Sequence, residues 1–371
     1  MRNSIVRLYA VMALADALGV LSAKLGLSGF SSSLFFFWFA VLPLPAGALC
    51  LTWGGGRIVG WSALLSALAC VALAVGASSR SFAVLGVALA GFANVVLQVA
   101  APVWMAESFP AGRLAGVLTG GLFVKTLMAV AFPFAVALAS SVGFWPLALA
   151  PFVALAACEI RLMRSPCPLP RAPQMKPMGA FGRDVRRVLS DPVAVAAMAA
   201  FAVAIVADVL FNLSVPDVVA RRFGSGEIAV ALVYAVLFGV KLPVMLGGMW
   251  LFRRLDARRT FLPSVLVAVT GTGLMTAFGG YFACLVGVAL FAAGFANVYG
   301  QVFDAVLSRH PTAAASVSSL LVLSISAGAL ASPILSAVRA WGGCTPEVAV
   351  FSLVSLLLPL AVFLSLARLR S

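Results

Sequence analysis

The sequence predicts an all-α membrane protein with twelve transmembrane helices in two six-helix bundles. Composition is the first reason, because hydrophobic residues make up 63% of the 371 residues and charged residues only 10%. A soluble domain carries about a quarter of charged residues. The second reason is that apolar stretches recur along the whole chain, near the length of about 20 residues that a membrane-spanning helix needs. Together these observations exclude a sizeable soluble domain.

Twelve apolar stretches define the expected helices in order. They are 4–24, 33–53, 58–78, 82–106, 114–139, 143–162, 193–215, 227–252, 260–278, 281–306, 315–338 and 348–367. Short turns separate most of them, as at Gly54-Gly55-Gly56. The first stretch is near full span length and lacks a small-residue cleavage site, so we expect a transmembrane helix there rather than a signal peptide.

One long connector, 163–192, divides the chain. It holds several prolines among basic residues and shows no apolar period, so we expect an exposed cytoplasmic linker. The expected organisation is therefore an N-terminal bundle of six helices over 1–162, the linker, and a C-terminal bundle of six helices over 193–371.

The positive charges predict the orientation of the chain. If the N-terminus is cytoplasmic, eighteen of the 25 Lys and Arg residues fall on the cytoplasmic side and five on the opposite side. We therefore expect an integral multi-pass protein of the cytoplasmic (inner) membrane with both termini in the cytoplasm. The net charge of +14 then reflects topology and contact with the lipid bilayer, and no nucleic acid is needed to explain it. Tryptophans at span ends are expected to anchor the membrane interface: Trp104, Trp250 and Trp341.

The two halves of the chain repeat each other in specific places. Asp16 in the first span and Asp208 in the seventh stand in similar local sequences. In the fourth and tenth spans the sequence Gly-Phe-Ala-Asn-Val occurs twice, at 91–95 and 294–298, and each copy is followed by a glutamine. Six helices separate the copies, so both cross the membrane in the same sense. Parallel repeats of this kind predict a pseudo-two-fold axis along the membrane normal.

Three short stretches resemble motifs of a known family. They are Asp16-Ala17-Leu18 in the first span, Pro45-Ala46-Gly47 in the second and Leu97-Gln98-Val99-Ala100-Ala101-Pro102 in the fourth. Each is similar to a motif of the fucose/glucose–proton symporter branch of the major facilitator superfamily. The resemblance implies a secondary transporter in which Asp16 matches the branch's proton-linked carboxylate and Gln98 matches the acid or amide at its sugar site.

Four ionisable residues lie near the middle of expected spans: Asp16, Asp208, Lys125 and Lys241. Each ionised side chain costs about 2.5–3.5 kcal/mol at the centre of the bilayer, so it must pair, face water, or both. One interpretation is two structural ion pairs. The other is that Asp16 and Asp208 are proton-coupling residues in a central cavity, where closure favours the protonated carboxyl. The lysines are then charge partners that neutralise the acids, or they bind an anionic substrate.

Amide side chains form the second polar set. Asn94 and Gln98 are four residues apart and share a helix face, and Asn297 and Gln301 repeat this spacing. These amides either hold helices together or donate hydrogen bonds to substrate hydroxyls. Two further residues, Asn212 and Tyr299, join the expected substrate-binding set, and Asp304 with Arg309 forms an expected gating pair at the cytoplasmic end of the tenth span.

These observations predict a secondary active transporter that moves a small polar solute, a sugar in the first instance, by alternating access with proton coupling. The chain has no P-loop pattern, which disfavours ATP-driven pumping, and its single histidine, His310, disfavours a catalytic triad or a histidine-rich metal site. We therefore expect no enzyme, no cofactor and no metal, and a monomer. Three alternatives stay open: an organic-anion carrier or exchanger that uses the lysines, a non-transporting sensor or scaffold, and, more remotely, an intramembrane enzyme.

Overall fold

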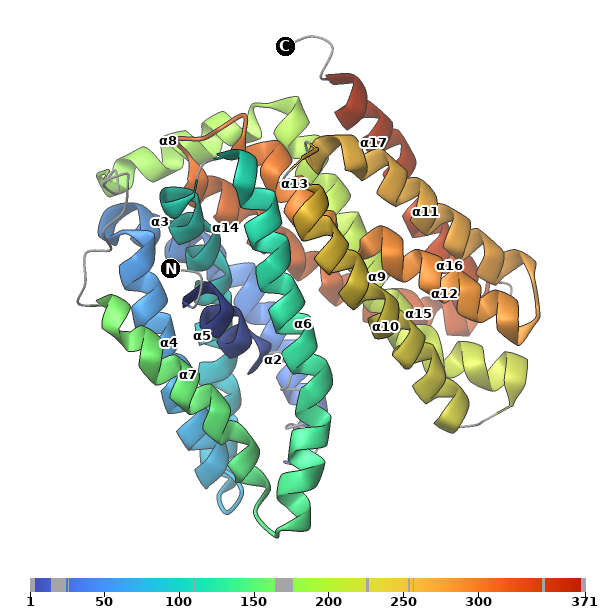
Figure 1. Ribbon diagram of the computed structural model, residues 1–371, viewed down its shortest axis with the longest axis horizontal. Helices are drawn as coiled ribbons and strands as arrows, with labels where there is room; N and C mark the ends of the chain where they lie inside the picture. Colours follow the sequence, from blue (N-terminus) through green and yellow to red (C-terminus); the bar gives the residue numbers. More distant parts are fainter. Residues whose placement is uncertain are drawn as a thin grey trace. The chain divides into compact units, whose positions relative to one another are not determined.

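The computed structural model describes residues 4–14, 25, 27–109, 111–163, 176–224, 227–252, 254–255, 257–341 and 344–367. These residues are almost entirely helical, and they include no strand (Figure 1). The first helix spans Ser4–Leu14. The other helices are α2 (Ser28–Val41), α3 (Pro43–Trp53), α4 (Gly55–Val75), α5 (Arg80–Ser108), α6 (Ala111–Ser141), α7 (Ala150–Ile160), α8 (Met178–Leu189), α9 (Pro192–Phe223), α10 (Glu227–Leu251), α11 (Ala257–Ala277), α12 (Tyr281–Phe295), α13 (Val298–Leu307), α14 (Ala314–Ser324), α15 (Ala331–Trp341), α16 (Pro346–Ser355) and α17 (Leu357–Leu366). Short 3₁₀ turns lie at η1 (Trp145–Leu149), η2 (Arg161–Met163) and η3 (Ile325–Leu330).

The helices follow the predicted apolar stretches. Within the described ranges, nine helical stretches are long and apolar enough to cross a membrane, and they coincide with nine of the twelve expected spans. Of the other three, 4–24 is described as a helix only to Leu14. The stretch 33–53 is divided between α2 and α3 at Leu42, next to Pro43, whose ring leaves no N–H for the helix ladder. The stretch 143–162 begins as η1 and continues as α7.

The chain forms two compact units that exchange short segments. Unit 1 comprises residues within 1–110, 120–187 and 312–323. Unit 2 comprises residues within 111–119, 188–311 and 324–371. The expected bundle boundaries, 162 and 193, stay a prediction, because these units are defined by contacts and not by connectivity.

In unit 1, small residues bring α4 and α5 close together. A Cβ atom at Gly86 would lie 2.8 Å from the backbone nitrogen of Leu73, so only glycine fits at this point. Close backbone approach is how helices associate in lipid, where no hydrophobic driving force acts between them. A core of buried residues from α4, α5, α6 and α7 extends from this contact, and the rings of Phe132 and Phe152 pack in it with centroids 5.4 Å apart.

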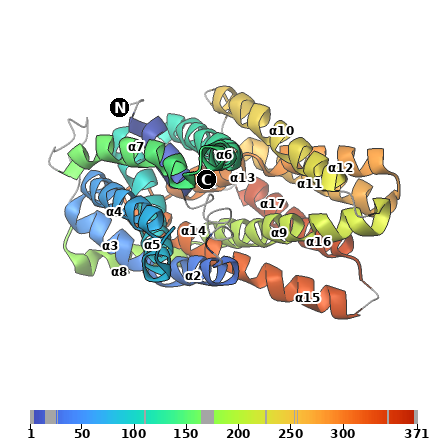
Figure 2. The same cartoon turned by 90° about the horizontal axis from the view of Figure 1, so that it is seen from below.

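In unit 2, a close contact at glycine likewise joins α11 and α12, which lie side by side (Figure 2). A Cβ atom at Gly271 would lie 2.6 Å from the carbonyl oxygen of Gly287. The core of this unit centres on Phe291, which is fully buried. Its ring lies 4.5 Å, between centroids, from both Phe211 of α9 and Phe295 of α12.

Residues 312–323 pack inside unit 1 although they come late in the chain. The hydroxyl of Ser318 donates a 2.8 Å hydrogen bond to the carbonyl oxygen of Val99 on α5. Gly47 on α3 faces the Ser319 hydroxyl so closely that any side chain at Gly47 would overlap it. The first half of α14 therefore contacts both α3 and α5.

Residues 111–119 pack in unit 2, although the residues on either side of them belong to unit 1. A Cβ atom at Gly300 would lie 2.7 Å from the Thr119 hydroxyl oxygen, and one at Gly116 would lie 3.2 Å from the carbonyl oxygen of Met249. The first turns of α6 thus pack on α13 and α10 through glycines.

The predicted linker is not uniformly exposed, and the expectation that 163–192 has no apolar period is wrong for its second half. Helix α8 occupies that half and buries Phe181 and Val188. Lys176, just before it, pairs with Asp184 at 3.1 Å and donates to the carbonyl oxygen of Thr312 at 3.2 Å. The apolar period was hard to see because charged residues of α8 outnumber its buried ones.

One expected interface anchor is wrong as well. Trp104 is 1% exposed, because α5 continues to Ser108 and Trp104 packs on the start of α4. A Cβ atom at Gly55 would lie 2.8 Å from the Trp104 backbone nitrogen, and one at Gly56 would lie 3.3 Å from the indole Cδ1. The indoles of Trp250 and Trp341, by contrast, are exposed.

Candidate functional site

An ion pair between α9 and α10 is the central polar feature of unit 2. Lys241 Nζ lies 2.8 Å from Asp208 Oδ1. The lysine side chain is 11% exposed and the aspartate side chain 32%. Two charges in a helical core therefore neutralise each other, and the carboxylate is the more accessible partner.

Two further polar side chains lie on the same two helices. The Asn212 side-chain amide donates a 2.7 Å hydrogen bond to the carbonyl oxygen of Asp208, one helical turn earlier. The Tyr234 hydroxyl of α10 donates at 2.8 Å to the carbonyl oxygen of Asn212. Tyr234 was not predicted, although its position two turns before Lys241 on the same helix is a signal that could have identified it.

The amides of unit 1 lie inside the bundle. Asn94 and Gln98 are both buried on α5, and Gln98 Nε2 donates to Asn94 Oδ1 at 3.5 Å. Asn94 Nδ2 and Trp38 Nε1 are buried donors that find no acceptor in the described part of the chain. Trp38 packs beside this helix, since a Cβ atom at Gly91 would lie 2.8 Å from its ring. Unsatisfied buried donors are uncommon and point to a missing partner such as water or a ligand.

The amides of unit 2 differ from their repeat equivalents. The helix stops at Phe295 and restarts at Val298, so Asn297 stands at a break, with φ −114° and ψ 1°. Its Nδ2 donates to the carbonyl oxygen of Val244 at 3.4 Å, and its Oδ1 is buried without a donor among the described residues. Gly248 makes this approach possible, because a Cβ atom there would lie 2.5 Å from Asn297 Oδ1.

Gln301 is engaged with α11. Its Nε2 donates to the Thr260 hydroxyl at 2.8 Å and to the Ser264 hydroxyl at 3.0 Å. Both partners were missed by the sequence reasoning, although their spacing of four residues places them on one helix face. Tyr299 packs between aromatic rings, 5.5 Å from Phe201 and 5.8 Å from Phe303. Within unit 2, Gln301 is therefore hydrogen-bonded to α11, and Tyr299 is packed against aromatic rings.

The remaining predicted residues are placed as follows. Asp16 lies outside the described residues. Lys125 is half-buried on α6, in unit 1. Asp304 is half-buried on α13.

Arg309 pairs with a residue that sequence reasoning did not select. Its guanidinium lies 2.7 Å from Asp191 Oδ2, and His310 Nε2 lies 3.0 Å from the same oxygen. Asp191 also caps α9 by accepting from the backbone N–H of Val193. Burial alone would raise the pKa of Asp191, but the hydrogen bonds from Arg309, Val193 and His310 hold it below its ordinary value. The gating role of Asp304 and Arg309 stays a prediction.

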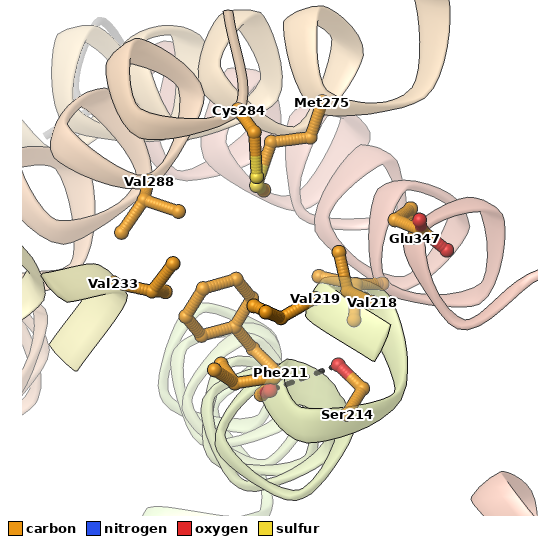
Figure 3. Close-up of a pocket in the computed structure, with 11 residues that line it drawn as sticks. Phe211, Ser214, Val218, Val219, Val233, Met275, Cys284, Val288 and Glu347 are labelled. Atoms are coloured by element: carbon orange, nitrogen blue, oxygen red, sulfur yellow. Dashed lines mark hydrogen bonds between the residues drawn. The ribbon is translucent and has the colours of Figure 1, made fainter. Parts of the chain in front are cut away.

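A cavity inside unit 2 lies apart from these polar groups (Figure 3). Valines and Phe211, Met275 and Cys284 line most of it. Its one carboxylate, Glu347, is held by Arg221 at 2.7 Å and by Arg222 at 2.9 Å. The hydroxyl of Ser214 donates to the carbonyl oxygen of Phe211. An apolar cavity whose polar groups are satisfied does not suit a polar solute.

A family model decides the identity of the chain. The model, described as the Major Facilitator Superfamily, matches residues 3–333. The chain belongs to the major facilitator superfamily. The predicted family and the predicted fold of twelve transmembrane helices in two bundles are thereby confirmed.

Solved structures of superfamily members are similar to this chain over its length. The fucose:proton symporter of E. coli matches with a TM-score of 0.85 and 16% identity, covering 98% of this chain and 97% of that one. A proton:xylose symporter bound to 6-bromo-6-deoxy-D-glucose matches at 0.67 and 12%, covering 98% and 93%. A bacterial homologue of the iron transporter ferroportin matches at 0.71 and 14%, covering 98% of both chains. No curated protein matches the chain by sequence.

The superfamily fold alone does not select a substrate, because two sugar symporters and a relative of an iron transporter share it with this chain. Within the described residues, no three His, Cys, Asp or Glu side chains gather as a metal site would require. The chain is a multi-pass membrane transporter of the superfamily, and the chemistry of its solute must be argued from the polar residues above.

Proposed function

We propose that this protein carries a small neutral polar solute, a sugar, across the inner membrane in symport with protons by alternating access. The observation that carries the proposal is the Asp208–Lys241 ion pair, accompanied by buried amides in both units. The N-terminal bundle over 1–162, the linker over 163–192, the C-terminal bundle over 193–371, cytoplasmic termini and a monomeric state belong to the same proposal.

Proton coupling is supported by the exposure of Asp208. Its side chain is 32% exposed while Lys241 is 11% exposed, so water can deliver a proton to the carboxylate without first hydrating the lysine. Protonation would cancel the ion pair and leave a buried ammonium without a partner, which is costly. The two protonation states therefore favour different arrangements of α9 and α10, and a transport cycle needs two such states. Asp16 is the proposed equivalent in unit 1.

A neutral solute is supported by the amides. Lys241 is already matched by a carboxylate, which leaves no excess charge at this pair for an anion to bind. Among the described residues, Asn94 of unit 1 has a side-chain donor without an acceptor, and Asn297 of unit 2 has a side-chain acceptor without a donor. In either unit an amide can bind a hydroxyl group, because a hydroxyl both donates and accepts hydrogen bonds.

The second candidate is an organic-anion carrier. It is favoured by one observation, that Lys241 is a buried cation whose only ion-pair partner in the described chain can be neutralised by a proton. In that case a substrate carboxylate would replace Asp208 beside Lys241, with Lys125 as the further cation. A non-transporting sensor or scaffold is the remaining alternative, and it has no need of accessible ionisable groups.

Proton flux into proteoliposomes tests these functions. The purified full-length protein, with a trapped pH dye, is challenged with hexoses, pentoses and small carboxylates. We expect acidification of the lumen with a sugar, and we expect Asp208→Asn to abolish proton flux while sugar exchange between the two sides continues. Asp208→Glu keeps a carboxylate and should retain coupled flux, which guards against a fold defect in the first variant.

The matched control is Asp217→Asn, since Asp217 is also a half-exposed carboxylate on α9 but pairs with Arg339 at 2.7 Å. It should leave coupled flux unchanged. A response to carboxylates alone would replace the sugar proposal by the anion carrier. Unchanged proton flux in Asp208→Asn would remove this residue from the coupling path, and silence with every solute, together with blank binding assays, would favour a sensor.

A further inference from the structure

Helix α8 has one face that the other described residues leave exposed. At 100° per residue, Phe181 and Val188 fall on one side of the helix, and both are buried. Met178, Val185 and Leu189 fall on the neighbouring side, within roughly 40° of one another. Met178 is 60% exposed and Leu189 is 49% exposed. An apolar stripe beyond the buried stripe is therefore presented outward.

Two exposed arginines follow this apolar stripe round the helix. At 100° per residue, Arg186 lies about 60° from Leu189, next to the stripe, and Arg183 lies about 60° further round. Neither makes a hydrogen bond or an ion pair with any residue that the structure describes. The acid of the helix, Asp184, lies toward the buried side and is matched by Lys176 at 3.1 Å. The outward face thus combines uncovered apolar side chains with positive charge that nothing in the described chain neutralises.

The position of α8 suits a boundary between water and lipid. In Figure 1, α8 runs across the end of α3 within unit 1 rather than alongside it. The backbone N–H of Lys176 donates to the carbonyl oxygen of Leu51 near the end of α3, and Phe181 packs on Gly47 of that helix. The spanning helix α9 begins at Pro192, directly after α8. A basic amphipathic helix in such a place has the pattern of helices that lie in the membrane interface.

We propose that Met178, Arg183, Val185, Arg186 and Leu189, the lipid face of α8, bind anionic phospholipid headgroups at the cytoplasmic leaflet. The two guanidinium groups pair with headgroup phosphates, and the apolar stripe rests on the upper part of the acyl chains. A helix bathed only in water would have no reason to expose Met178 and Leu189. The negative surface of the cytoplasmic leaflet supplies the complementary charge. This inference does not depend on the transported solute.

Native mass spectrometry of the full-length protein in detergent tests the lipid face. The protein is titrated with phosphatidylglycerol and, in parallel, with phosphatidylcholine of the same acyl chains. We expect preferential retention of phosphatidylglycerol. Replacing both arginines, Arg183→Gln with Arg186→Gln, should weaken phosphatidylglycerol binding by about tenfold or more, because each basic residue near an anionic surface contributes roughly fivefold. Binding of phosphatidylcholine should stay as in the wild type.

Three further arms separate the possible sources of binding. The variant Arg80→Gln with Arg259→Gln loses the same charge at exposed positions outside α8, and it should bind phosphatidylglycerol as the wild type does. Met178→Gln with Leu189→Gln should weaken both lipids, because it removes the apolar stripe. Excess inorganic phosphate should not displace the lipid, whereas a bare phosphate site would release it. Thermal unfolding checks that each variant is folded.

The proposal is overturned by any of four results. One is unchanged phosphatidylglycerol binding in the double arginine variant. The second is an equal loss in the control variant, which would mean that net charge and not α8 governs binding. The third is displacement of the lipid by phosphate, and the fourth is equal retention of both lipids by the wild type.

Discussion

At the scale of single residues, the Asp208–Lys241 pair places two opposite charges in the helical core of unit 2. A buried ion pair adds little net stability, yet removing one partner is costly because the other charge is left uncompensated. Lys241 is the more buried partner, so loss of Asp208 should be felt more strongly than loss of Lys241.

We predict that Asp208→Asn lowers the free energy of unfolding by about 3 kcal/mol, the lower end of the range for breaking a buried pair. Adding Lys241→Met should restore stability to within about 1 kcal/mol of the wild type, because no charge then remains. Unfolding of the purified protein in detergent measures both. If the double variant is as unstable as the sum of the two single variants, the two side chains are not coupled.

The sequence predicted which residues are polar inside the membrane, but not what each one contacts. Asn94 and Asn297 sit in the same five-residue sequence, Gly-Phe-Ala-Asn-Val. Asn94 lies in the middle of the continuous helix α5, whereas Asn297 stands at the break between α12 and α13. Because the local sequence is identical, the difference arises from the neighbouring helices, where α10 supplies Gly248 and a carbonyl oxygen to Asn297.

At the scale of elements, hydropathy located the spans well because length and apolar content are local properties. It failed at α8, where the buried side chains are few, and at Trp104, where the end of α5 could not be fixed from composition. Contacts between elements were the least predictable. Arg309 lies five residues from Asp304 in sequence but pairs with Asp191 across the gap between α13 and α9.

The link between α9 and α13 predicts a pH dependence. The pKa of Asp191 lies below its ordinary value of about 3.9, so the folded state favours the ionised carboxylate. The stability from this group is fully present above that value and is lost as the pH falls through the lowered pKa. Asn caps a helix about as well as Asp, so Asp191→Asn isolates the charge. We expect the variant to be less stable than the wild type near neutral pH.

Unfolding temperatures of wild type and Asp191→Asn, measured from about pH 7 to about pH 3, test this prediction. The difference should be constant down to about pH 4 and shrink below it. A difference that disappears between about pH 7 and pH 5 would instead assign the effect to another group. A difference that persists at the lowest pH would show that the carboxylate charge is not what Asn removes.

At the scale of the whole molecule, two short segments belong to a different folded unit from the residues on either side of them in sequence. Residues 312–323 belong to unit 1, and residues 111–119 belong to unit 2. The sequence could not predict that residues 312–323 belong to unit 1, because the contact depends on Gly47 and Ser319, which are far apart in sequence. Small residues at these contacts are visible in the sequence, but their partners are not.

We predict that Gly47→Val releases the start of α14 from unit 1. Its side chain would overlap Ser319 and press on Phe181, and such overpacking costs about 1–3 kcal/mol. In a background without the native cysteines, Ser318→Cys should be protected from a maleimide reagent, since Ser318 is fully buried, and should become reactive when Gly47→Val is added. Gly247→Val is the control, because nothing lies within 4 Å of a Cβ atom there. Equal labelling with and without Gly47→Val would mean that the segment is not held by this contact.

The place of residues 312–323 in unit 1 also bears on how the protein is made. A chain is synthesised from its N-terminus, so α3 and α5 enter the membrane long before the segment that fills the space between them. Until residue 323 has been inserted, Gly47 faces a gap and the carbonyl oxygen of Val99 has yet to meet the Ser318 hydroxyl. The first half of this transporter is therefore finished only when the second half is nearly complete, and a fragment that stops at the linker would leave that seam open to lipid or to quality-control proteases.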